Sequence, residues 1–195
     1  GMGSENIDFR LRQSDFSMDA ERTGVPWIGH AIDEVDSFDA LFIIGSFLRK
    51  DHPLLSARVR HAAKNGTRVL SMHATVEDWL MPVSVQQALA PHRWVDHLIE
   101  VLVACAGQLQ QPAPAMYHEV EPSAEAHALA AALLEGENRV IWLGNTAVQH
   151  PQYGAILQVV QAIAHLTGAR FGVIGEAANS VGGYLATALP VVGSR

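Results

Sequence analysis

The chain contains nearly the same strand–turn–helix–strand pattern twice, and this repetition limits the folds that it can adopt. The first copy, residues 39–73, reads DALFIIG-SFLRKD-HP-LLSARVRHAAKN-G-TRVLSMH, and the second, residues 139–175, reads RVIWLG-NTAVQ-HP-QYGAILQVVQAIAHLT-G-ARFGVIG. Continuous apolar runs of this length are typical of parallel strands that helices cover on both faces. The pattern therefore predicts an α/β fold with a doubly wound, mostly parallel Rossmann-like sheet and helices on both faces.

Helices are expected between and beside these strands. Pro53 suits the first position of the first crossover helix, and Gly66 suits the position just after its end. Further helices are predicted at about 92–109 and 123–135 from their apolar spacing. Cys105 falls on the apolar face of the first of these, which predicts a buried thiol.

Three segments are predicted along the chain. Residues 1–37 form a polar entry segment, residues 38–190 form the α/β domain, and residues 191–195 form a tail. Within the domain, an internal boundary is possible near 110–122, where the sequence QQPAP breaks the helical pattern. A Gly ahead of the first Met resembles the scar of a removed tag, so we expect the chain to be an expressed piece of a larger protein.

Composition excludes several function classes. The formal charge of −7 argues against nucleic acid as a partner, because phosphate binding requires clustered Lys and Arg. A single cysteine permits no disulfide within the chain, and the ten histidines lack the spacing of a metal site. No apolar run reaches the roughly 18–20 residues of a membrane span, so no direct membrane insertion is expected.

The turns after the strands mark the place where such a sheet binds ligands, outside the carboxyl ends of its strands. Each of the turns 45–52 and 144–150 has one Gly followed by larger side chains, and no phosphate-binding GxxxxGK[ST] motif occurs. Glu176 is the one acidic candidate for a ribose contact, and the His residues that precede Pro are better explained by hydrogen bonds to their turns than by catalysis. No residue is assigned a catalytic or metal-binding role. The candidates for lining a vestigial cofactor pocket are Gly45, Ser46, His52, Gly144, Gln149, His150, Asn179, Ser180 and Gly182.

Several of these motifs resemble the middle domains of the molybdopterin oxidoreductases. The stretch from Phe38 to Leu54, with Gly45-Ser46 and His52-Pro53, is similar to a strand, turn and His-Pro helix of that superfamily. The opening residues 6–13 and the loop 176–185, with its Asn-Ser-Val-Gly sequence, more narrowly resemble the large iron–sulfur subunits of bacterial NADH:quinone oxidoreductase, respiratory complex I. The likeness runs over nearly the whole chain, but Phe47-Leu48, Thr146 and Met72-His73 stand where cofactor-binding relatives have other residues.

This resemblance implies a non-catalytic structural module of a respiratory electron-transfer subunit. It implies that iron–sulfur clusters lie elsewhere in the parent subunit, that the molybdopterin has been lost, and that this segment holds no cofactor. The implied partners are other domains of the same subunit and neighbouring subunits of the complex, on the cytoplasmic side of the bacterial inner membrane. Two alternatives remain open: a fragment of an active molybdopterin-dependent oxidoreductase, and a small-molecule-binding α/β module.

Overall fold

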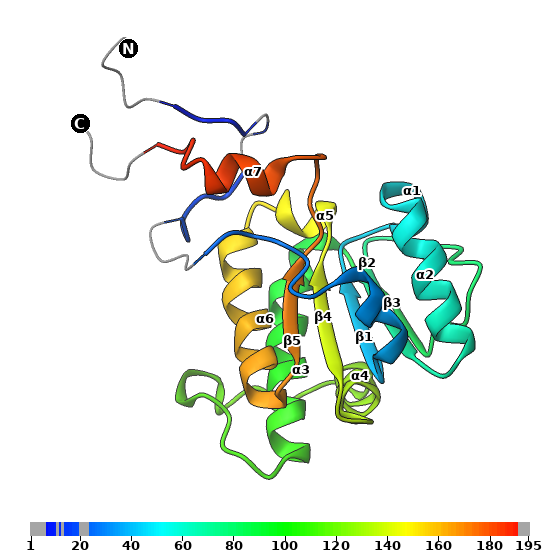
Figure 1. The fold of residues 1–195 in the computed structure, drawn as a ribbon. Coiled ribbons are helices and arrows are strands. Elements are labelled where there is room, and N and C mark those ends of the chain that lie inside the picture. The colour runs from blue at the N-terminus through cyan, green and yellow to red at the C-terminus, as the bar shows by residue number, and fades with distance from the viewer. Residues whose placement is uncertain (1–6, 11, 13, 20–23, 191–195) are drawn as a thin grey trace.

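The chain folds around one five-stranded sheet in which every paired strand is parallel (Figure 1). A computed structural model describes residues 7–10, 12, 14–19 and 24–190, so the predicted tail and the first six residues of the entry segment lie outside the described residues. The strand order is β3-β2-β1-β4-β5. The strands are β1 (Ala40–Ile44), β2 (Arg68–His73), β3 (Val85–Ala88), β4 (Arg139–Leu143) and β5 (Arg170–Val173). The predicted α/β class with a parallel sheet is confirmed.

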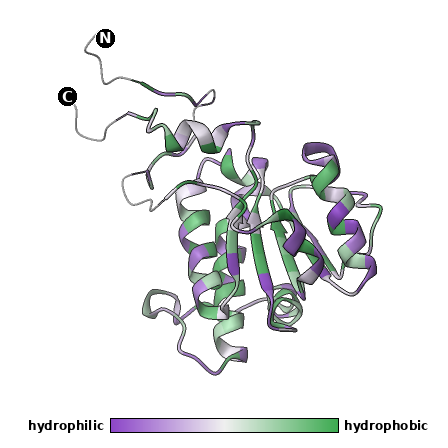
Figure 2. Cartoon of the chain, viewed as in Figure 1, coloured by the Kyte–Doolittle hydropathy of each residue, from purple (hydrophilic) through white to green (hydrophobic). Residues whose placement is uncertain are grey.

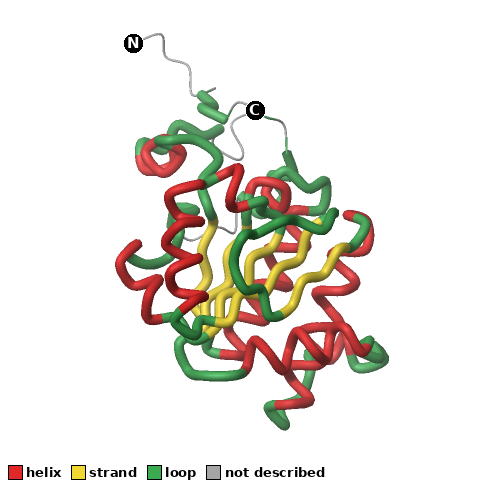
Figure 3. Tube along the Cα trace, turned by 90° about the vertical axis from the view of Figure 1, so that its right-hand side faces the viewer, coloured by secondary structure: helices red, strands yellow, loops and turns green. Residues whose placement is uncertain are grey.

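Helices cover both faces of the sheet, as Figures 1 and 3 show. Helices α3, α4 and α6 pack on one face, and α2 with the short 3₁₀ helix η1 packs on the other. The α-helices are α1 (Leu48–Asp51), α2 (Pro53–Lys64), α3 (Trp94–Gln108), α4 (Ala124–Leu134), α5 (Asn145–Val148), α6 (Tyr153–Thr167) and α7 (Ser180–Leu185). The 3₁₀ helices are η1 (Ile32–Ser37), η2 (Pro91–Arg93) and η3 (Ala115–Tyr117).

The central strand β1 divides the core into two hydrophobic clusters. Its five residues are all fully buried, because successive side chains of a strand point to opposite faces and both faces are covered. Phe42 belongs to the cluster under α3, α4 and α6, whereas Leu41 and Ile43 belong to the cluster under α2 and η1. Figure 2 shows the same pattern, with hydrophobic strands in the middle and an α2 outside that has both hydrophilic and hydrophobic residues. The predicted thiol of Cys105 is buried in the first cluster, and burial raises its pKa to about 12.

The helix ends follow the residue types found there. Pro53 begins α2 at its first turn, where a missing N–H breaks no helical hydrogen bond. Ser123 caps α4 by accepting a hydrogen bond from the backbone N–H of Ala126 at 3.3 Å. Gly168 ends α6 with φ of +69°, in the left-handed region that glycine adopts at low cost. The helices predicted from Pro53, at 92–109 and at 123–135 all occur within a few residues of the expected bounds.

Strand β3 was not expected from the sequence. It reads VQQA, and its one buried residue is polar, so it lacks the apolar alternation of a half-buried strand. Gln87 is buried because its amide donates to the Glu125 carbonyl at 2.8 Å, while its carbonyl lies 2.6 Å from Nε2 of His97 on α3. A polar network under two helices therefore fixes this edge of the sheet.

The first described residues pack against α7, beyond the upper end of the sheet in Figure 1. The backbone N–H of Phe9 donates to the Ala188 carbonyl at 3.1 Å, and the rings of Phe9 and Tyr184 meet edge to face with centroids 5.0 Å apart. The last described residues thus contact the entry segment. Within the described part of the chain, no helix is long and apolar enough to cross a bilayer.

Candidate functional site

The strand order reverses direction between β1 and β4, and the loops that follow these two strands lie at the carboxyl edge of the sheet. Open parallel sheets bind ligands in the crevice at such a switch point, where two loops diverge. In this chain the two loops meet instead. The N–H of Gly144 donates to the Ile44 carbonyl at 2.8 Å, and the N–H of Thr146 donates to the Gly45 carbonyl at 2.8 Å.

Glycine allows the loops to come this close. Gly45 has φ of +66°, and a Cβ at this position would lie 2.5 Å from the backbone nitrogen of Ala147. A Cβ at Gly144 would overlap the side chain of Ser46. Three of the nine predicted lining residues, Gly45, Ser46 and Gly144, are therefore brought together, and they fill the switch-point crevice with protein.

The polar groups of the first loop bond within that loop. Ser46 is 1 % exposed, and its hydroxyl donates to Asp51 Oδ2 at 3.1 Å. The same carboxylate oxygen accepts the backbone N–H of Phe47 at 3.0 Å. These bonds hold the loop rigidly against α1.

His150 lies on the far side of its own loop and is buried. Its ring stacks on Trp94 with an angle of 14° between the planes and 5.6 Å between centroids. Its Nε2 lies 3.0 Å from the Pro91 carbonyl, and its Nδ1 accepts the backbone N–H of Gln152 at 3.0 Å. Both ring nitrogens are used, so this side chain ties the loop to η2 and α3.

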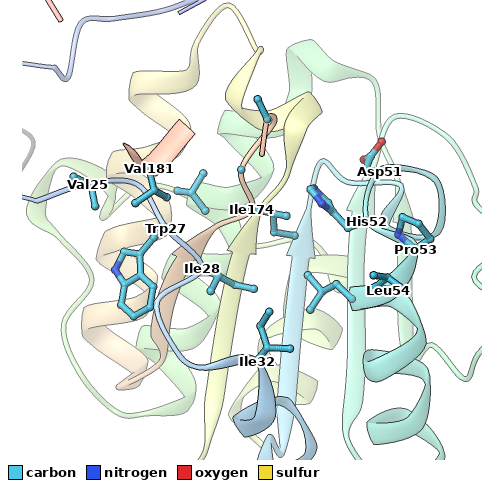
Figure 4. A pocket seen from close by; sticks show the side chains of 14 residues that line it. Val25, Trp27, Ile28, Ile32, Asp51, His52, Pro53, Leu54, Ile174 and Val181 are labelled. Carbon is cyan, nitrogen blue, oxygen red and sulfur yellow. The ribbon is translucent and has the colours of Figure 1, made fainter. Parts of the chain in front are cut away.

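His52 lines a separate hollow of about 880 Å³ in front of the sheet (Figure 4). Side chains from the segment before η1, from the start of α2 and from the residues after β5 converge on this hollow. Of the described residues that line it, only Asp51, His52 and Trp27 have a polar atom in the side chain. Nε2 of His52 is buried without a hydrogen-bond partner in the structure, and burial lowers the pKa of this ring.

Gln149, Asn179 and Ser180 line a second hollow, of about 720 Å³, between the entry segment, α6 and α7. Its polar wall is an internal network. Glu176 accepts the Gln149 amide at 3.1 Å and pairs with the guanidinium of Arg12. Ser180 donates to the Ala177 carbonyl at 3.1 Å, within the turn that begins α7.

Gly182 is also set by local geometry, since a Cβ there would overlap the side-chain amide of Asn179. The predicted lining residues thus occupy four different places: the closed crevice, the apolar hollow, the buried contact with Trp94, and the second hollow. They do not form one pocket.

Sequence reasoning missed a cluster of three side chains across the carboxyl edge. His73 ends β2, Glu77 follows it by four residues, and Thr146 lies in α5. Thr146 Oγ1 is 3.5 Å from His73 Nε2, and Glu77 Oε1 is 3.3 Å from His73 Nδ1. The spacing of His73 and Glu77 is visible in the sequence, but the approach of Thr146 is a consequence of the strand order. Among the described residues, no three or more His, Cys, Asp or Glu side chains are grouped as metal ligands would be.

Comparison with known proteins identifies a fold neighbour. No protein-family model and no curated protein matches the chain. The fold is similar to that of a chain in the crystal structure of the formyltransferase/hydrolase complex (FhcABCD) from Methylorubrum extorquens in complex with methylofuran. The TM-score is 0.53 at 16 % sequence identity, over 84 % of this chain and 46 % of that chain. The chain therefore spans less than half of that neighbour, and at this identity the likeness shows the fold alone.

This neighbour corrects the functional prediction made from the sequence motifs. The assignment to the large iron–sulfur subunit of NADH:quinone oxidoreductase is wrong, and so is the predicted module of the respiratory chain, because the neighbour belongs to a formyltransferase/hydrolase complex. Neither alternative, the molybdopterin-dependent fragment nor the small-molecule module, gains support. The neighbour is part of a complex of several subunits. A position at the inner membrane stays a prediction.

Three buried or partly buried histidines make the stability of the fold depend on pH. Burial lowers the pKa of His30, His52 and His97 from the ordinary value of 6.5, so the folded state favours their neutral forms. Their contribution to stability is complete above pH 6.5 and is lost as the pH falls through the lowered values. We expect the urea concentration at the midpoint of unfolding to fall steadily from pH 7 to pH 5. The carboxylates with lowered pKa values remain ionised in the folded state over this range, so the change is assigned to the histidines.

A matched pair of variants separates this effect from general acid sensitivity. His52→Gln should flatten the pH dependence, whereas His127→Gln, at an exposed position on α4, should leave it unchanged. A midpoint that is constant from pH 7 to pH 5 would contradict the prediction.

Proposed function

We propose that this chain is a protein-binding module that joins another subunit of a multi-subunit enzyme assembly. The observation that carries this proposal is the apolar hollow in front of the sheet (Figure 4). Leu54 on its rim is 89 % exposed, Ile32 is 58 % exposed and Trp27 is 50 % exposed. Contiguous apolar surface of this kind on a folded protein marks a site of interaction.

The walls of the hollow belong to rigid elements. Ile174 and Ile28 form its floor, beside strand β5; Ile174 belongs to the core cluster under α2 and η1, and Ile28 is partly buried and packs against that cluster. The backbone N–H of Val173 donates to the Trp27 carbonyl at 2.7 Å, which fixes the segment before η1 along the edge of the sheet. A preformed apolar surface costs little ordering entropy when a partner binds.

A protein subunit fits this hollow better than a polar metabolite would. The lining offers only the side chains of Asp51, His52 and Trp27 for hydrogen bonds, and Asp51 already accepts two bonds from its own loop. An apolar side chain of a partner would remove Leu54, Ile32 and Trp27 from water, at about 25 cal/mol for each Å² buried. The fold neighbour, a chain of a complex of several subunits, agrees with this type of role.

The proposal is tested by purifying the tagged chain from cells that naturally contain it. We expect a different polypeptide to co-purify in a fixed molar ratio and to survive gel filtration. The double variant Ile32→Asp/Leu54→Asp should release that polypeptide, because it places two charges on the apolar surface. Met116→Asp is the matched control, since Met116 is 77 % exposed and lies on η3, away from the hollow.

Two results would contradict the proposal. One is a chain that elutes alone, or only with a second copy of itself. The other is a partner that the Met116→Asp variant loses as readily as the double variant does. Circular dichroism of both variants checks that the fold is intact.

A further inference from the structure

Helices α1 and α2 form a basic region on an otherwise acidic chain. Residues 49–68 contain six of the 13 Lys and Arg residues and one acidic residue, Asp51, so this segment has a formal charge of +5, whereas the whole chain has −7. The two lysines of the chain, Lys50 and Lys64, both lie in it. Helix α1 contacts α2 at the right of Figure 1, so these charges are close together in space.

Three of the six cations are paired within the fold. The pairs are Arg49 Nη2 with Asp78 Oδ2 at 3.8 Å, Arg58 Nη1 with Asp36 Oδ2 at 2.9 Å, and Arg68 with Glu135. The other three, Lys50, Arg60 and Lys64, are exposed, and none of them forms an ion pair with a described residue. The described part of the chain therefore supplies no counter-charge for half of this basic region.

Arg60 and Lys64 share one face of α2 with Leu54. The exposed residues of this helix are Pro53, Leu54, Ala57, Arg60, His61 and Lys64. At 3.6 residues per turn, they all fall within about one third of the helix circumference. Leu54 lies at the rim of the apolar hollow, and Lys64 lies about 15 Å further along the helix axis. The exposed face from Ala57 to Lys64, which we call the basic strip, thus continues the apolar surface of the hollow.

An acidic polypeptide matches this combination of surfaces. Carboxylates that face unpaired cations steer a partner during association and fix its register. A nucleic acid would need many cations for its phosphates and would gain little from the apolar hollow beside them. Leu54, where the strip meets the hollow, is 89 % exposed. The surface therefore suits a protein segment that has apolar and acidic side chains next to each other.

We propose that the partner subunit binds through an acidic segment: one of its apolar side chains enters the hollow beside Leu54, and its Asp or Glu side chains lie along Arg60 and Lys64. This inference rests on the proposed function, because the same partner would cover the hollow and the basic strip. The ion pairs would stay partly in water, so each strengthens binding only modestly. Their main effect is on the rate of association and on its dependence on salt.

The first test measures the affinity of the purified chain for the co-purified partner by titration, at about 0.05 M and about 0.5 M salt. We expect Arg60→Glu and Lys64→Glu each to weaken binding by about threefold or more at the lower salt, because each replaces an attraction by a repulsion. The difference should shrink at the higher salt, where exposed charges are screened. Arg93→Glu is the matched control and should leave the affinity unchanged, since Arg93 is exposed and directly precedes α3, which packs on the other face of the sheet.

Chemical cross-linking tests the contact itself. A water-soluble carbodiimide joins a lysine amine directly to a carboxylate, without a spacer between them. We expect it to link Lys64 to an Asp or Glu residue of the partner, which peptide mass spectrometry identifies. Lys64→Arg should keep the affinity, because the positive charge stays, but should lose this link.

The outcomes separate this inference from the proposed function. If Ile32→Asp/Leu54→Asp releases the partner but Arg60→Glu and Lys64→Glu bind it as tightly as the unchanged chain, the acidic segment is overturned and the proposed function stands. A chain that elutes alone overturns both. The inference also fails if Lys64 is linked only to a second copy of this chain, or if nuclease treatment releases the partner. Circular dichroism of each variant checks that the fold is intact.

Discussion

Trp142→Ala is expected to lower the free energy of unfolding by about 3–5 kcal/mol, the range for truncation of a fully buried large aromatic side chain. Trp142 lies on β4 with no exposed surface, in the core cluster under α2 and η1. Its ring stacks on His30 at 17° with centroids 5.4 Å apart, and Phe38 meets it edge to face at 6.3 Å. Truncation would therefore leave a cavity between the sheet and the segment that precedes β1.

Trp142→Ala also removes a buried hydrogen bond, which lowers the stability further. The indole Nε1–H of Trp142 donates to His30 Nε2 at 3.0 Å, and His30 is 3 % exposed. Removing the donor leaves a buried acceptor without a partner, which by itself costs about 1–3 kcal/mol. Trp142→Phe keeps a six-membered aromatic ring but removes the N–H group together with the rest of the indole, so its loss should be smaller than that of Trp142→Ala.

Urea titrations followed by circular dichroism measure both variants. Trp27→Ala is the matched control, since Trp27 is half exposed and its truncation should cost less than about 1 kcal/mol. Equal losses for Trp27→Ala and Trp142→Ala would contradict the packing described for β4.

Gly144→Ala is expected to destabilise the fold by about 2–3 kcal/mol, because a methyl group has no room where the two switch-point loops cross. The new Cβ would overlap the side chain of Ser46, which is itself 1 % exposed. The overlap can be relieved only if the two loops move apart. That movement would lengthen the backbone hydrogen bonds from Gly144 to Ile44 and from Thr146 to Gly45.

Gly107→Ala provides the control for a change of glycine to alanine. Gly107 lies in α3, and a Cβ there would meet nothing within 4 Å. Alanine should stabilise this helix by up to about 1 kcal/mol, since glycine loses more backbone entropy on folding. The expected result is a lower melting temperature for Gly144→Ala and an equal or higher one for Gly107→Ala. A Gly144→Ala variant as stable as the unchanged chain would show that the loops are not in contact.

The fold could be predicted because its signals are local. The apolar runs at β1 and β4, Pro53 at the start of α2 and Gly66 after its end are each read within one segment. Strand β3 escaped because its buried residue, Gln87, is stabilised by partners on α3 and α4. Such contacts between elements leave no periodic pattern in the strand itself.

The same reasoning explains why the motif resemblance predicted the fold class but the wrong function. Gly45 and Gly144 are required by two crossing loops, and Gly182 is required by the side chain of Asn179. Glycine is needed at these positions for backbone packing, and any parallel α/β sheet with similar loops can need it there whatever its function. Side chains of different loops that do approach each other, such as His73 and Thr146, are 73 positions apart in the sequence and meet only through the strand order.

The contact between Phe9 and α7 has a topological consequence. Because the backbone of Phe9 is hydrogen-bonded to that of Ala188, the described chain returns to its starting point and nearly closes a ring. A short linker could join these two places, and a new pair of ends could be opened in the connection between α3 and α4 without cutting a strand. Polypeptide attached before Phe9 or after Ala188 would leave the domain from one region. Both attachments would therefore emerge beside the second hollow, which Phe9 and Tyr184 line.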